Sequence, residues 1–259
     1  MEGQKSNTTL WVLLAIVAIL VIAIIIFGVM VINKPAEAPE ATQPAPEDPG
    51  QESPPQGPDP TPIPGDPEQE LGNPDGRDDF STKNNWTLFD DECFKSDIVD
   101  GQYVMTAKGK PHFSCWEVSW PSVQDYYLQT NLIMPDSCAA DDRFGLFIRT
   151  PDLNQGYLVG LTCDGRISMN RWDGEESKVL VNFVTSENIN TGSGTTNRIG
   201  VIANGSSYDL YANGQLIAQA EDGSYVDAMR FGYFVSTATE DGFTVKYDDM
   251  AIWLLEQPE

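Results

Sequence analysis

The sequence predicts an all-β globular domain, an antiparallel two-sheet β-sandwich, preceded by one transmembrane helix and a disordered proline-rich linker. Three observations lead to this prediction. Residues 10–32 are apolar throughout apart from one glycine, residues 33–83 are rich in proline and acidic side chains, and residues 84–259 contain short segments of alternating apolar and polar residues. Because the composition changes sharply at these borders, each region is considered by itself.

The apolar run at residues 10–32 is long enough to cross a hydrocarbon core, which needs about 20 helical residues. A cleaved signal peptide is the alternative, and Ala36-Glu37-Ala38 resembles a cleavage site. The apolar core of a secretory signal is usually only about 7 to 15 residues long. We therefore favour an uncleaved transmembrane anchor.

The linker at residues 33–83 holds many Pro, Glu, Asp, Gln and Gly residues and few side chains that build a core. Such a composition predicts a disordered, partly extended spacer, since prolines favour polyproline II and like charges repel. We expect this acidic stalk to hold the following domain away from the membrane.

The whole chain has 39 acidic and 15 basic residues, a formal net charge of -24. This charge opposes binding to nucleic acid and to anionic lipid surfaces by repulsion. Partners are expected to be neutral, cationic or bridged by metal ions, and nucleic acid is not among them.

The globular region contains four cysteines, Cys93, Cys115, Cys138 and Cys163, and the chain has one histidine, His112. No Cys-x-x-Cys pair occurs, so zinc binding has little support and two disulfides in an oxidising compartment fit better. Three pairings are possible; we favour the local one, Cys93 with Cys115 and Cys138 with Cys163.

Lysines flank the apolar run only sparsely, so they do not decide its orientation. The cysteines and the acidic linker do: they favour a cytoplasmic N-terminus at residues 1–9 and an extracellular domain at residues 84–259. The expected localisation is therefore a single-pass protein of the cell membrane.

Turn signals divide the globular region into strands. Asp100-Gly101, Asp164-Gly165 and Asn213-Gly214 stand between β-rich segments, as two-residue hairpin loops require. The expected strands are 96–99, 102–106, 126–133, 144–149, 157–162, 166–172, 199–203, 207–211, 216–220, 229–235 and 243–255. So many antiparallel strands bury two apolar faces against each other, which favours a sandwich over a barrel.

Several segments carry a family resemblance: Asp142–Arg149, Asn154–Gly160, Cys163–Arg166, Asn197–Val201, Leu210–Gly214 and the closing Val245–Ile252. They resemble the concanavalin A-like lectin/glucanase jelly rolls, and in style the bacterial 3-keto-disaccharide hydrolase-like modules and, more distantly, laminin-G-like domains. The resemblance covers about residues 84–255 and implies a jelly-roll fold. It does not imply one function, since this fold hosts lectins, hydrolases and adhesion modules.

Catalytic residues are not expected. Retaining glucanases of the superfamily place their carboxylates in a Glu-x-Asp-x-x-Glu arrangement, which this chain lacks. Acidic pairs such as Asp141-Asp142 and Glu221-Asp222 fall beside turn residues and are expected to be solvated. No cofactor is expected; calcium is compatible with loop oxygen ligands but is left unassigned.

Strand alternation predicts a polar and aromatic face. It separates Tyr127, Gln129 and Asn131 from inward Leu128 and Leu132, and it places Arg143, Phe147 and Arg149 opposite Phe144, Leu146 and Ile148. The candidate ligand-binding residues are Tyr127, Gln129, Asn131, Arg149, Asn170 and Trp172. Such rings and planar polar groups suit a saccharide.

The alternative for this face is that exposed sheet surfaces are polar anyway, with Arg149 paired to a carboxylate such as Asp152. Four further tryptophans, Trp86, Trp116, Trp120 and Trp253, are expected in the core or at its rim.

The leading functional hypothesis is a membrane-anchored extracellular recognition module that binds carbohydrate or a glycan-bearing polymer without catalysis. Two alternatives stay open. One is a glycoside hydrolase whose carboxylate pair comes from separate strands, and the other is a structural or protein-binding surface ectodomain.

Overall fold

The computed structural model describes residues 62–119, 122–228 and 230–255. The predicted transmembrane helix, the N-terminal segment before it and residues 33–61 of the predicted linker lie outside these ranges, as does Trp120. Within the described ranges, no helix combines the length and apolar character needed to cross a membrane.

The described residues form one short helix, α2 (Pro67–Leu71), and fourteen strands. The strands are β1 (Gly76–Asp78), β2 (Phe94–Val99), β3 (Gln102–Ala107), β4 (Phe113–Val118), β5 (Tyr126–Ile133), β6 (Arg143–Thr150), β7 (Gly156–Thr162), β8 (Arg166–Trp172), β9 (Ser177–Thr185), β10 (Thr196–Asn204), β11 (Ser207–Ala212), β12 (Gln215–Glu221), β13 (Arg230–Thr237) and β14 (Thr244–Leu254).

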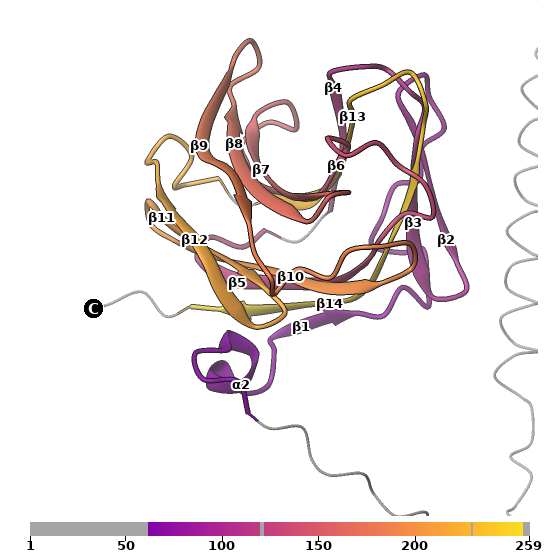
Figure 1. Ribbon diagram of the computed structural model, residues 1–259. Coiled ribbons are helices and arrows are strands. Elements are labelled where there is room, and N and C mark those ends of the chain that lie inside the picture. Colours follow the sequence, from indigo (N-terminus) through magenta and orange to yellow (C-terminus); the bar gives the residue numbers. More distant parts are fainter. Residues whose placement is uncertain (1–61, 120–121, 229, 256–259) are drawn as a thin grey trace, which may run out of the picture. The chain divides into compact units, whose positions relative to one another are not determined.

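The strands build two antiparallel sheets that face each other (Figure 1). Sheet A has eight strands in the order β12-β11-β10-β5-β14-β3-β2, with β1 added beside β14. Sheet B has six strands in the order β4-β13-β6-β7-β8-β9. The predicted all-β, two-sheet sandwich is confirmed.

The three hairpin turns expected from the sequence are present between β2 and β3, β7 and β8, and β11 and β12. In the first and last of these, both central residues have positive φ: 53° at Asp100 with 75° at Gly101, and 51° at Asn213 with 80° at Gly214. Asx and Gly residues adopt this conformation at the lowest cost, which explains why these dipeptides end the strands here.

Aromatic rings join the two inner faces. Tyr233 of sheet B stacks on Tyr247 of sheet A with ring centroids 4.0 Å apart, and Trp86 stacks on Tyr233 at 5.1 Å. The Tyr247 hydroxyl donates a hydrogen bond of 3.1 Å to the carbonyl of Phe234, so its polar end is satisfied inside the core. The predicted core position of Trp86 is confirmed.

Two disulfides tie the edges of the sandwich. Cys93 pairs with Cys115, joining the start of β2 in sheet A to β4 in sheet B, and Cys138 pairs with Cys163, joining the loop after β5 to the β7–β8 turn. Both pairs are the sequence-local ones, with Cα atoms 6.2 Å apart. Each restricts a loop that borders sheet B.

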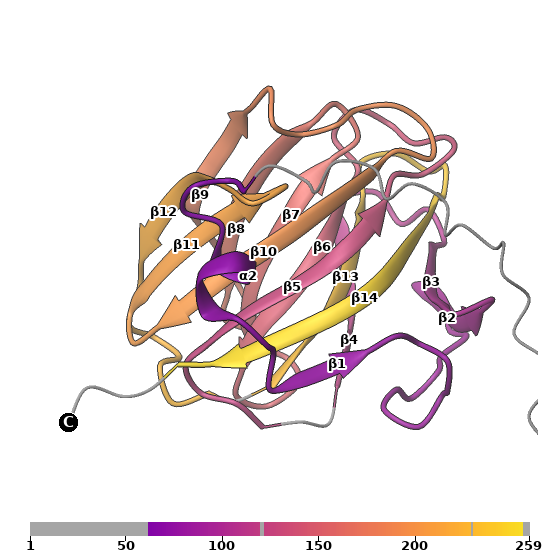
Figure 2. The same ribbon diagram turned by 90° about the horizontal axis from the view of Figure 1, so that it is seen from below.

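Residues 62–80, here called the N-terminal strap, correct the predicted extent of the disordered linker. Residues 62–75 lie across the outward face of sheet A, and β1 then joins that sheet as a strand beside β14 (Figure 2). Asp66, which caps α2, is buried and forms an ion pair with Arg198, and Trp253 Nε1 donates to the Gly72 carbonyl at 2.8 Å. The globular domain therefore begins before residue 84, because this strap covers apolar sheet surface.

The strap also reaches the core. Strand β1 pairs with the second half of β14, and Phe80 just beyond it is fully buried beside Trp86. The sequence conceals this element because proline and acidic residues surround its few apolar side chains.

A buried carboxyl group lies between the sheets at Glu117 of β4. It accepts hydrogen bonds from Tyr103 Oη and from Ser96 Oγ, the latter at 2.9 Å, while Oε1 has no partner among the described residues. Burial raises the pKa of Glu117 from an ordinary 4.5 to about 7. Below about pH 7 the folded protein therefore holds Glu117 mostly in its protonated form.

Replacement of Glu117 by Gln tests this assignment through the pH dependence of stability. Below about pH 4.5 both folded and unfolded forms of Glu117 are protonated, and as pH rises towards 7 the unfolded state loses its proton first. Wild type should therefore lose up to about 3 kcal/mol relative to Glu117→Gln between pH 4.5 and 8. Urea unfolding at both pH values measures the difference. The exposed-site control Glu92→Gln should show no such change, and a pH-independent difference for Glu117→Gln would contradict the assignment.

Candidate functional site: a groove on sheet B

Sheet B is strongly curved, with β9 at one edge and β4 at the other (Figure 1). A groove of about 920 Å³ lies on its outward face and is lined by side chains of β4, β6, β7, β8, β9 and β13. We call it the sheet B groove. Its size is within the range of small-molecule sites.

The floor of the groove depends on glycine. Gly160 of β7 lies beneath the ring of Phe234, and a Cβ atom at this position would stand 2.6 Å from Phe234 Cζ. Gly145 lies opposite Gly160 in the β6–β7 ladder. Because these positions lack side chains, the ring of Phe234 packs with Phe147 and Leu158 in an apolar cluster that forms the floor.

Aromatic side chains line the groove. Trp116 stacks on Phe147 with centroids 4.8 Å apart and its Nε1 donates to the Leu153 carbonyl at 2.8 Å. Trp172 packs against the same apolar floor, and Phe183 and Phe113 stand at the borders with 40% and 58% of their surface exposed. Aromatic rings of this kind stack against sugar C–H groups where a ring face is accessible.

A polar group lies among these rings. Arg143 Nη2 donates to Asn170 Oδ1 at 3.2 Å, and Asn170 Nδ2 donates to Ser177 Oγ at 3.2 Å. The Arg143 guanidinium lies 5.7 Å from the ring centroids of both Phe183 and Phe234. Desolvation lowers the pKa of Arg143 to about 10, so the side chain remains a cation at neutral pH.

Two carboxylates, Asp91 and Asp141, also line the groove. Asp91 accepts backbone N–H groups of Cys93 and Phe94, and the Phe94 hydrogen bond lowers its pKa, while Asp141 pairs with Arg166. Neither is set up as a proton donor, which a glycosidase acid must be.

Two of the six predicted ligand-binding residues lie in the sheet B groove. Asn170 and Trp172 project from β8 on the side opposite to the buried Ile167 and Met169, as alternation predicted.

Three others lie elsewhere. Tyr127, Gln129 and Asn131 are on β5, which belongs to sheet A, so they face away from the groove. Tyr127 is buried against Trp253 at 5.2 Å and donates to Gln129 Oε1 at 2.9 Å. Alternation identified the correct face of the strand, but it cannot identify the sheet to which a strand belongs.

Arg149 is the sixth, and the structure corrects its predicted outward position. A bulge opposite Arg230 and Phe231 gives it a φ of 51° and turns its side chain inward, where none of its surface is exposed. Its Nη2 pairs with Asp125 at 2.7 Å, and its Nη1 donates to the Val226 carbonyl. Its carboxylate partner is Asp125 rather than Asp152.

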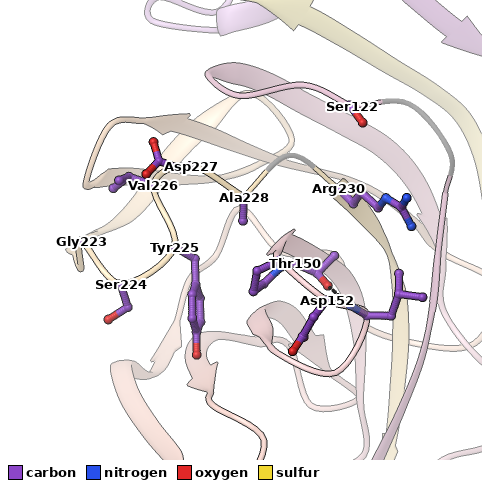
Figure 3. A pocket seen from close by; sticks show the side chains of 12 residues that line it. Ser122, Thr150, Asp152, Gly223, Ser224, Tyr225, Val226, Asp227, Ala228 and Arg230 are labelled. Carbon is purple, nitrogen blue, oxygen red and sulfur yellow. Dashed lines mark hydrogen bonds between the residues drawn. The ribbon is translucent and has the colours of Figure 1, made fainter.

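A second hollow, of about 610 Å³, lies where the loop after β6 meets the loop between β12 and β13. Figure 3 shows the Tyr225 ring on one side and Thr150, Asp152 and Arg230 on the other. The buried Arg149 supports this hollow from within through the Val226 carbonyl. Among the described residues its lining holds one aromatic ring, that of Tyr225, whereas several line the sheet B groove.

Sequence reasoning assigned Trp116 to the core or rim, and it left Arg143 and Phe183 out of the site. Trp116 and Phe183 belong to β4 and β9, which we did not predict as strands. Both form edges of sheet B, and most of β9 is exposed, so period-2 alternation is weak there. The outward position predicted for Arg143 was the one feature of the sequence that could have placed it in the site.

The described residues include no group of three or more His, Cys, Asp or Glu side chains that could hold a metal ion.

No protein-family model matches the chain, and no curated protein matches it in sequence. Similar solved structures include the carbohydrate binding module CBM66 from Bacillus subtilis, with a TM-score of 0.51 and 14% identity over 65% of this chain and 95% of that chain. The GH43 protein BlXynB from Bacillus licheniformis has a TM-score of 0.53 and 15% identity over 70% of this chain and 39% of that chain. At such low identity the likeness establishes the fold alone. The domain has the concanavalin A-like jelly-roll fold that its sequence resembles.

Replacement of Arg149 by Met should destabilise the domain rather than alter a binding surface. The substitution leaves Asp125 as an unpaired buried carboxylate, which should cost about 3–5 kcal/mol of unfolding free energy. Urea unfolding checks this value. The control Arg77→Met, on the exposed side of β1, should change stability by less than about 0.5 kcal/mol. Equal effects of the two substitutions would refute the structural role of Arg149.

Proposed function

We propose that this protein is a membrane-anchored extracellular recognition module that binds carbohydrate in the sheet B groove without catalysis. The observation that carries the proposal is the lining of that groove, which holds Trp116 and Trp172 together with the hydrogen-bonded pair Arg143 and Asn170. Flat rings beside planar donors and acceptors are the groups that recognise a pyranose face and its hydroxyls.

The fold supports this proposal. One similar solved structure is described as a carbohydrate binding module and a second as a GH43 protein. The chain covers 95% of the binding module but 39% of the GH43 protein, so the module is the better match in extent.

The engagement of the groove carboxylates favours binding over hydrolysis. A retaining or inverting glycosidase needs one carboxyl that donates a proton and a second that acts as nucleophile or base. Asp91 is held by backbone N–H groups and Asp141 by Arg166, whereas the carboxyl with a raised pKa, Glu117, is buried between the sheets.

The membrane anchor in this proposal is the apolar run at residues 10–32, which lies outside the described residues. The N-terminus would be cytoplasmic and the disulfide-bonded domain extracellular. The two disulfides support an oxidising compartment for the domain.

A glycan array probed with the full chain in mild detergent tests carbohydrate binding, with calcium in one arm and chelator in the other. We expect specific binding that weakens about tenfold for Trp172→Ala and for Trp116→Ala, because each loses a stacking surface. Retention of binding in chelator would exclude a required metal. The control Leu216→Ala removes an exposed apolar side chain from sheet A and should bind as wild type does.

Silence across the array for wild type, with the fold intact by circular dichroism, would reject carbohydrate recognition. It would then favour the alternative of a structural or protein-binding ectodomain. Turnover of a glycoside on the same array, lost on removal of one carboxylate, would instead establish the hydrolase.

Cell fractionation tests the anchor. The full chain should remain with membranes after a carbonate wash at high pH, whereas a variant lacking residues 10–32 should be released, because about 20 apolar helical residues hold a chain in the bilayer. Protease added to intact cells should reach the domain if it is extracellular. Release of the full chain by carbonate would contradict the anchor.

A further inference from the structure

The sheet B groove contains one unmatched positive charge. Arg143 is the only arginine or lysine among the described residues that line it. Arg149, Arg166, Arg171 and Arg198 each form an ion pair with an aspartate, whereas Arg143 forms none within the described ranges. Arg143 is half-buried, so this guanidinium lacks a carboxylate partner at a position partly withdrawn from water.

The guanidinium is held in place by neutral groups alone. The rings of Phe183 and Phe234 lie near it, and Asn170 Oδ1 accepts from Nη2. Its Nε is buried and has no hydrogen-bond partner among the described residues. A cation removed from water in this way is stabilised when an anion or further acceptors complete its contacts.

The same face carries further donors without acceptors. Trp172 Nε1, in the groove lining, and Ser168 Oγ, on the same strand β8, are buried and unpartnered within the described residues. A ligand with strong acceptor atoms, placed with small side-chain shifts, would meet the donors of Arg143 and Trp172. A guanidinium pairs best with a planar oxyanion, through two parallel N–H···O bonds.

We propose that the sheet B groove recognises a glycan that carries an acidic group, a carboxylate or a sulfate, which Arg143 binds. This inference rests on the proposed carbohydrate binding and names its ligand class. Trp116 and Trp172 would hold the sugar ring, and Arg143 would select the acidic substituent.

The surroundings limit how much negative charge the ligand carries. Asp91 and Asp141 border the groove, and the chain as a whole repels polyanions. Screening confines that repulsion to about 8 Å at physiological ionic strength, so it opposes a polyanion far more than one oxyanion seated at Arg143. The geometry therefore fits a single acidic group on an otherwise neutral glycan.

The test uses the full chain in mild detergent on an array of matched glycans. Each uronic acid-terminated oligosaccharide stands beside its methyl ester, and each singly sulfated oligosaccharide beside its unsulfated form. We expect the acidic member of the recognised pair to bind about tenfold or more tightly than the neutral one, which is the scale of a hydrogen-bonded charge. The two sets distinguish carboxylate from sulfate.

Arg143→Gln should lose that preference: the acidic member should weaken about tenfold more than the neutral one, so that the two bind within about twofold of each other. Arg143→Lys keeps the positive charge but loses the planar guanidinium that forms two parallel hydrogen bonds. It should retain part of the preference for the acidic glycan. The matched control Arg77→Gln removes the same charge from the outward side of sheet A and should leave both affinities unchanged. Melting curves confirm that each variant is folded.

Equal binding of acidic and neutral members by wild type would overturn the acidic-ligand inference while leaving carbohydrate binding intact. So would an equal loss of both members in Arg143→Gln. If Arg143→Gln fails to fold, the inference is tested by the ratio of acidic to neutral glycan affinity in wild type and in Arg143→Lys. Silence on every glycan would reject carbohydrate binding itself and this inference with it.

Discussion

The stacking of Tyr233 on Tyr247 is the contact on which the arrangement of the domain depends, since it binds one sheet to the other at the centre of the core. Trp86 extends the stack towards the N-terminal strap, and Tyr103 continues it within sheet A. Once both inner faces are engaged in this way, only outward faces remain for recognition. The strap covers much of sheet A, so sheet B presents the open one.

Period-2 alternation and hairpin dipeptides were enough to predict the sandwich and the inward residues Leu128, Leu132, Phe144, Leu146 and Ile148. They could not assign strands to sheets, because sheet order follows from long-range pairing. For this reason Tyr127 and Trp172 were predicted to share one face, although they lie on different sheets. They could not predict the buried position of Arg149 either. A one-residue bulge interrupts the alternation of inward and outward side chains at that point. The strap escaped detection because local composition resembles a linker while its burial depends on distant partners such as Trp253.

The acidic character of the domain is partly structural. Asp142 and Asp222, expected as solvated turn residues, are both buried. Asp142 accepts the N–H groups of Ala139 and Ala238 at 2.7 Å each and so joins two loops at the border of the sheet B groove. Asp222, just after β12, accepts from Tyr157, Arg171 and Lys178. These carboxylates hold loops in position, which explains how a chain so rich in aspartate retains an ordered, largely uncharged groove floor.

The N-terminal strap also has a mechanical consequence. A pulling force transmitted along the chain from its N-terminal side enters the domain at the strap, where the Asp66–Arg198 ion pair and the pairing of β1 with β14 receive it. These contacts belong to sheet A, and the strands that form the groove belong to sheet B. Tension would therefore be borne by sheet A rather than by sheet B. A domain built in this way can be pulled from its N-terminal side before the shape of the sheet B groove changes.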